Sequence, residues 1–96
     1  MQSIDRARRR MKLRDLNILL AVAQRGSMAK AATELAISQP AVSKAVADLE
    51  RAIGHRLLDR SRNGVELTPC GRALVSRGVA IFDELTQGLH ELEALA

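Results

Sequence analysis

Apolar residues recur along most of the chain at the three- and four-residue steps that are typical of helices. Gly26 ends the first periodic segment, whose apolar face holds Leu13, Leu16, Leu20 and Ala23. Ser27 is a suitable N-cap for a second, alanine-rich helix that reaches about residue 36. Ser38 is the next N-cap, and Pro40 falls in the first turn of a third helix that runs to about residue 52. The spacing of its apolar residues predicts one buried stripe, made by Val42, Val46, Leu49 and Ile53. The pattern therefore predicts three short helices over residues 13–52.

The periodicity changes after residue 55. Two strand-like pieces, residues 57–60 and 65–67, flank a turn that contains Asn63-Gly64. Asn-Gly between apolar runs is the strongest short hairpin signal, so we expect a small two-stranded wing. Thr68-Pro69 then begins a fourth helix that can continue to the end of the chain, over residues 68–96.

The fourth helix carries an apolar stripe that is too long to be buried against itself. We expect this stripe to pair with its copy in a homodimer, since a partner helix is needed to cover it. The alternative is that this stripe is buried within a monomer as part of its hydrophobic core. The predicted dimerisation residues are Leu74, Gly78, Ile81, Phe82, Leu85, Leu89 and Leu92.

Length and charge refine this organisation. A chain of 96 residues holds one small domain, and we divide it into a flexible basic arm (1–12), a head (13–67) and the long helix (68–96). Residues 1–62 carry a net charge of +7 and residues 63–96 a net charge of −3. A basic charge of this density favours a polyanionic partner, and a solvated surface with surplus arginine is the alternative. The near absence of aromatic residues argues against modules that stack single-stranded bases on aromatic rings.

Other chemistry is poorly represented in the sequence. Cys70 is the only cysteine, so no internal disulfide can form. The longest apolar run, residues 18–23, is too short to span a membrane. No nucleotide-binding loop, metal-ligand spacing or catalytic constellation occurs. We therefore expect no cofactor, no metal site, no enzymatic activity and no membrane association, and a cytoplasmic, nucleoid-associated location.

The second and third helices have the arrangement of a helix-turn-helix, in which the second helix enters the DNA major groove. Gln39 at its start can bond an adenine edge, and Ser43 and Lys44 can reach other base edges. We expect contacts to the DNA backbone from helix starts, from the third helix and from the wing, at Ser27, Ser38, Arg51, Arg60 and Arg62. For the two wing arginines, Arg60 and Arg62, the narrow minor groove is the alternative to a phosphate.

The sequence resembles the LysR-type transcriptional regulators over about residues 13–90. The resemblance rests on the run Ser38-Gln39-Pro40-Ala41-Val42-Ser43 together with Gly26-Ser27, Ala31-Ala32, Leu35, Leu49-Glu50, Gly54, Leu57, Arg60, Val65, Leu67-Thr68 and Gly71. It implies a mainly α fold, a winged helix-turn-helix followed by a linker helix that pairs two subunits. It also implies that double-stranded operator DNA is bound, with bases contacted by Gln39, Pro40, Ser43 and Lys44.

The sequence also departs from the family pattern. Leu19, Met28 and Leu58 stand where aromatic residues are usual, and Glu66 stands at a wing position that is often basic. Family members are longer and end in an effector domain, so we interpret the chain as the DNA-binding part of a longer regulator. A small-molecule inducer would bind only in that absent domain, and dimer and tetramer both remain open for the full-length regulator. The competing hypothesis is a helical protein-partner module that uses the helix-turn-helix as a scaffold.

Overall fold

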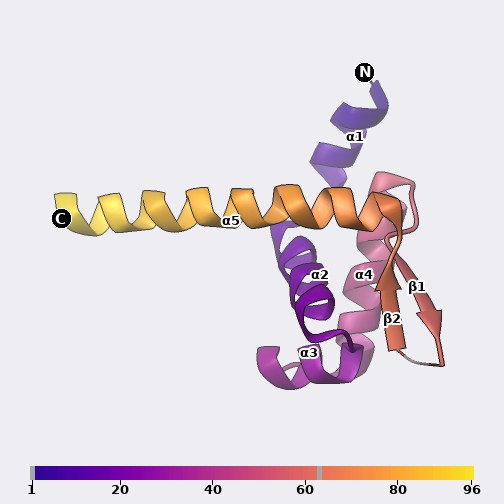
Figure 1. Cartoon of the computed structure of the whole chain (residues 1–96). Coiled ribbons are helices and arrows are strands. Elements are labelled where there is room, and N and C mark those ends of the chain that lie inside the picture. The colour runs from indigo at the N-terminus through magenta and orange to yellow at the C-terminus, as the bar shows by residue number, and fades with distance from the viewer. Residues whose placement is uncertain (1, 63) are drawn as a thin grey trace.

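Three helices and a hairpin form a head that a long helix crosses (Figure 1). The computed structural model describes residues 2–62 and 64–96. No helix in these ranges is long and apolar enough to cross a membrane. The elements in chain order are α1 (Gln2–Arg10), α2 (Leu13–Arg25), α3 (Met28–Leu35), α4 (Gln39–Ile53), β1 (Leu58–Ser61), β2 (Gly64–Leu67) and α5 (Pro69–Leu95).

The helix boundaries follow local capping chemistry, as the sequence predicts. The Ser27 hydroxyl accepts a hydrogen bond from the Lys30 amide at 3.2 Å, and the Ser38 hydroxyl accepts one from the Ala41 amide at 3.2 Å. Thr68 caps α5 in the same way. Each cap satisfies a backbone N–H group that the helix itself leaves without a partner.

The core lies between α2, α3, α4 and the start of β1. Val42, Val46 and Leu49, three residues of the predicted stripe on α4, are buried, whereas Ile53 is only partly buried. The largest fully buried side chains are Leu16, Leu19, Val22, Val42, Leu49 and Leu57. Burial of each such side chain stabilises the fold by about 1.5–3 kcal/mol, so this cluster is the main source of stability in the head.

The wing, residues 58–67, is an antiparallel hairpin in which Leu58 pairs with Leu67 and Ser61 pairs with Gly64. Asn63, half of the predicted turn signal, lies outside the described residues. Glu50 of α4 ties the hairpin to the helix, because its carboxylate accepts the backbone N–H groups of Leu57 at 2.8 Å and of Leu58 at 3.3 Å. The Leu49-Glu50 pair belongs to the family motif, but the sequence does not reveal this role.

The first half of α5 packs on the head of its own chain. A Cβ atom on Gly78 would lie 2.9 Å from Leu20 Cδ1 and 3.3 Å from Leu16 Cδ1, so the glycine permits the close approach of α5 to α2. Leu74 and Phe82 are partly buried against the same core. Three residues predicted for the dimer face are therefore used within the chain. The rest of the predicted stripe is exposed and consists of Ile81, Leu85, Leu89 and Leu92.

The N-terminal segment differs from the expectation of a flexible arm. Residues Gln2–Arg10 form α1, which contacts α4. The physical reason is a short apolar face with helical spacing, made by Ile4, Ala7 and Met11. These residues line a groove of about 550 Å³ together with Ile53 and Leu74. The sequence analysis predicts a flexible arm and no helix here, whereas the structure places Gln2–Arg10 in a helix.

Candidate nucleic-acid interface

The turn between α3 and α4 fixes the position of α4, which is the third helix of the sequence prediction. Ala36 adopts a left-handed conformation with φ 57°, and the Ile37 amide donates to the Ala32 carbonyl at 3.1 Å. Ala31, Ala32 and Ala45 are buried, and their small side chains allow the helices to approach closely. The first turns of α4 are consequently held at the surface beside α3 (Figure 1).

The residues predicted to contact bases lie together at the start of α4. Gln39, Pro40 and Lys44 are exposed, whereas Ser43 is half-buried. The Ser43 hydroxyl donates to the Met28 sulfur at 3.2 Å and accepts from Arg60 Nη2 at 3.4 Å. Ser43 thus connects α3, α4 and the wing, so a base can engage it only by replacing or sharing one of these partners.

Lys44 and Arg51 are held by a common acidic partner. Lys44 Nζ lies 2.8 Å from Asp48 Oδ2, and Arg51 forms an ion pair with the other carboxylate oxygen. The hydrogen bond from Lys44 holds the pKa of Asp48 below its ordinary value of 3.8, and the positive charges of Lys44 and Arg51 act in the same direction. The four-residue spacing of Lys44 and Asp48 is a signal that the sequence interpretation missed. Each cation keeps N–H donors that Asp48 does not use, so it can contact DNA either while paired with Asp48 or in its place.

The wing adds basic side chains beside α4. Arg60 lies on β1 and reaches Ser43, whereas Arg62 is exposed just after β1. The hydroxyl groups of Ser27 and Ser38 are used as N-caps, so phosphate contacts at these helix starts would come from backbone N–H groups. The structure thus places the predicted contact residues on α3, α4 and the wing.

We also searched the described residues for metal ligands and for a reactive thiol. Within residues 2–62 and 64–96 no group of three or more His, Cys, Asp and Glu side chains could hold a metal ion. Cys70 is an exposed free thiol in the first turn of α5. The candidate site is therefore the helix-turn-helix surface formed by α3, α4 and the wing.

Comparison with known proteins agrees with this arrangement. The family model described as bacterial regulatory helix-turn-helix protein, lysR family, matches residues 13–72. The uncharacterized HTH-type transcriptional regulator YdcI of Escherichia coli (strain K12) is 39% identical over 89 residues, which are 90% of this chain and 29% of YdcI. HTH-type transcriptional regulator TdcA of the same strain is 38% identical over 85 residues, which are 88% of this chain and 27% of TdcA. The chain thus spans about three tenths of the length of these relatives.

Two solved structures of DNA complexes have the same fold. The CbnR_DBD-DNA complex matches with a TM-score of 0.83 and 35% identity, over 88% of this chain and 98% of that chain. The BenM_DBD/catB site 1 DNA complex matches with a TM-score of 0.86 and 30% identity, over 88% of this chain and 96% of that chain. Both similar chains are nearly covered in full, so the likeness extends over the whole domain.

Proposed function

Because the chain belongs to the LysR family of bacterial regulatory helix-turn-helix proteins, we propose that it reads double-stranded DNA with α4 in the major groove. The observation that carries the proposal is the exposed start of α4, where Gln39 presents a side-chain amide and Pro40 a short apolar ring beside the basic wing. The two similar domains solved in complex with DNA support it.

Each residue of this surface has a proposed role. Gln39 bonds an adenine edge, Pro40 supplies an apolar contact, and Ser43 and Lys44 bond the neighbouring bases. Backbone phosphates are contacted by the helix starts at Ser27 and Ser38 and by the side chains of Arg51, Arg60 and Arg62. Phosphate contacts set affinity and position the protein, whereas the contacts of α4 discriminate sequence.

We also propose a homodimer through the exposed part of α5. Ile81 and Leu85 are 43% and 46% exposed, and Leu89 and Leu92 are more exposed still, although all four lie on one face. Charge favours an antiparallel pair, because Arg72 and Arg77 lie in the first half of α5 and its acidic residues lie in the second half. The relatives are more than three times as long as this chain. Transcription control, inducer binding and tetramer formation are therefore proposed only for a regulator of that length.

The DNA-binding proposal is tested by two variants, one of which should change base preference and the other the overall affinity for DNA. A binding sequence is first selected from a pool of random duplexes, and affinities are then measured by fluorescence anisotropy on that duplex and its single-base variants. Gln39→Ala should flatten the preference at one half-site position, by about 1–3 kcal/mol. Arg62→Ala should weaken all duplexes equally and lower the salt dependence. Equal weakening of all duplexes by both variants would show that α4 does not read bases.

The dimer proposal is tested by sedimentation. Ile81→Glu combined with Leu85→Glu should give monomers, because the charges would be buried without partners at the seam. Gln87→Glu, on the opposite side of α5, is the matched control and should leave the dimer intact. A dimer that survives the double substitution would place the interface elsewhere.

The second candidate function is a protein-partner module, which the exposed apolar face of α5 favours. It predicts self-association or partner binding without any affinity for duplex DNA at low salt. The anisotropy titration therefore separates the two functions directly.

A further inference from the structure

Helix α1 lies outside the residues matched by the family model, which begin at residue 13. It packs across the C-terminal end of α4 and faces the first half of α5. The groove of about 550 Å³ beneath it is lined by residues from all three helices, among them Ile4, Arg8, Ile53 and Leu74. Ile4 is 65% exposed, so α1 carries an uncovered apolar side chain at this groove.

The charge on α1 is strongly one-sided. Arg6, Arg8, Arg9 and Arg10 are all exposed, and Asp5 is the one acidic residue of the helix. Among residues 2–62 and 64–96 none of the four arginines forms an ion pair. Four unpaired guanidinium groups on a helix docked to the head fit an acidic partner surface.

The second half of α5 has the opposite charge. After Arg77 it holds no Lys or Arg, and its acidic residues are Asp83, Glu84, Glu91 and Glu93. All four are exposed, and this part of the helix projects beyond the head (Figure 1). The chain therefore carries a basic helix and an acidic helix end that are separated from each other in one molecule.

An antiparallel pair of α5 helices brings these two surfaces together. If the pair is symmetric about Leu85, near the middle of the exposed stripe, Glu93 of a second copy lies level with Arg77. Arg77 is three residues, or about 4.5 Å along the axis, from Leu74, which lines the groove under α1. That separation is within the reach of an arginine side chain.

We infer that α1 is a second, charged part of the dimer interface, in which Arg8 and Arg9 pair with Glu91 and Glu93 of a second copy of this chain. The inference rests on the proposed α5 dimer and adds a contact that residues 13–72 do not provide. DNA is a less suitable partner for α1, because the predicted base contacts lie at the start of α4. The 15 residues of α4 separate its two ends by about 22 Å.

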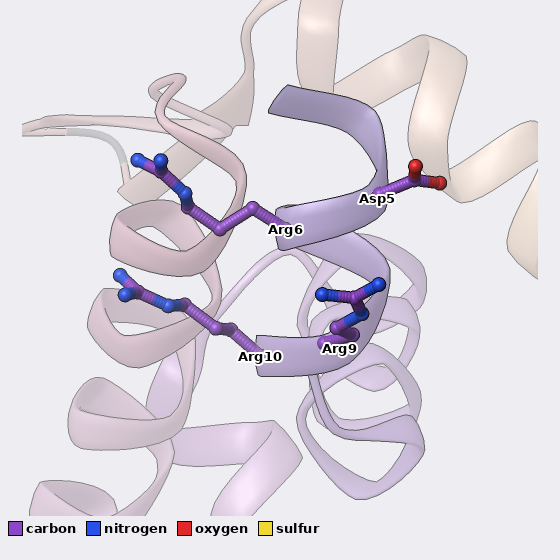
Figure 2. A pocket seen from close by; sticks show the side chains of 4 residues that line it. All are labelled: Asp5, Arg6, Arg9 and Arg10. Carbon is purple, nitrogen blue, oxygen red and sulfur yellow. The ribbon is translucent and has the colours of Figure 1, made fainter. Parts of the chain in front are cut away.

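The two sides of α1 provide a matched control. Figure 2 shows Arg6 and Arg10 extending to one side, over α4, whereas Asp5 extends to the other side. Arg8 lines the groove together with Leu74 of α5. Charge reversal of Arg6 and Arg10 changes the net charge by the same amount as reversal of Arg8 and Arg9. It leaves Arg8, the arginine at the groove beside Leu74, in place.

The test is a charge swap followed by sedimentation equilibrium of the full chain in 50 mM salt. Arg8→Glu with Arg9→Glu should weaken dimerisation about tenfold, and Glu91→Arg with Glu93→Arg should do the same. A chain that carries all four substitutions should regain most of the wild-type affinity, which a misfolded variant cannot do. Arg6→Glu with Arg10→Glu should leave the dimer unchanged.

Each other outcome is informative. A wild-type chain that sediments as a monomer would overturn the α5 dimer and this inference together, while leaving DNA binding untouched. A wild-type dimer without rescue in the fourfold variant would overturn only the role of α1. If Arg8→Glu with Arg9→Glu weakened binding to the selected duplex but not dimerisation, α1 would be a DNA contact and the inference would be wrong.

Discussion

Glu50 offers the sharpest test of how the wing is held against α4. Its carboxylate accepts backbone N–H groups from Leu57 at 2.8 Å and from Leu58 at 3.3 Å. These two residues are only 1% and 4% exposed, so water cannot readily replace the carboxylate. We therefore expect Glu50→Ala to leave two buried donors without an acceptor.

The magnitude follows from these contacts. Each N–H group left without an acceptor costs about 1–3 kcal/mol, so Glu50→Ala, which affects two of them, should lower the free energy of unfolding by about 2–6 kcal/mol. For a domain of this size, 1 kcal/mol corresponds to a Tm change of about 4–8 °C. A fall in Tm of at least about 8 °C is therefore expected.

Circular dichroism at 222 nm during thermal unfolding is a suitable assay, because the chain contains no Trp or Tyr for fluorescence. Both N–H groups donate to the same oxygen, Glu50 Oε2, so the amide oxygen of Glu50→Gln can accept both bonds. This variant loses only the negative charge, which makes such bonds roughly twice as strong, and should lose about half as much stability. Glu66→Ala removes an exposed carboxylate from β2 and is the matched control, with an expected change within about 0.5 kcal/mol. If Glu50→Ala were as mild as Glu66→Ala, the proposed tie between α4 and the wing would be refuted.

Three further predictions concern other elements. Gly78→Leu should destabilise the fold by about 1–3 kcal/mol in thermal unfolding through overpacking against α2. Asp48→Asn should release Lys44 and strengthen binding to random duplexes at low salt. Because the pKa of Asp48 is lowered on folding, its contribution to stability is present above pH 3.8 and is lost as the pH falls through the folded pKa, so acid titrations of the wild type and of Asp48→Asn should converge. Ala36→Gly should stabilise the chain by about 1 kcal/mol in the same unfolding assay, since residue 36 has φ 57°.

Much of the secondary structure could be predicted from the sequence because its causes are local. Serine and threonine N-caps, the glycine after α2 and the proline in the first turn of α4 act within a few residues of the boundaries they set. The buried stripe of α4 follows from spacing alone, and Val42, Val46 and Leu49 are buried as predicted. The family motif likewise marks the start of α4 as the candidate site, because it is a continuous run of residues.

Only the tertiary structure decided which element packs against the apolar face of each helix. Spacing placed Gly78 and Ile81 on one stripe, but packing covers Gly78 with α2 and leaves Ile81 exposed. Ser43 and Arg60 are 17 residues apart, and only the fold brings them together. The spacing of Ile4, Ala7 and Met11 is compatible with a helix, but only the tertiary structure shows that α1 docks on α4. An amphipathic pattern identifies the apolar side of a helix, but what covers that side depends on residues far away in the sequence.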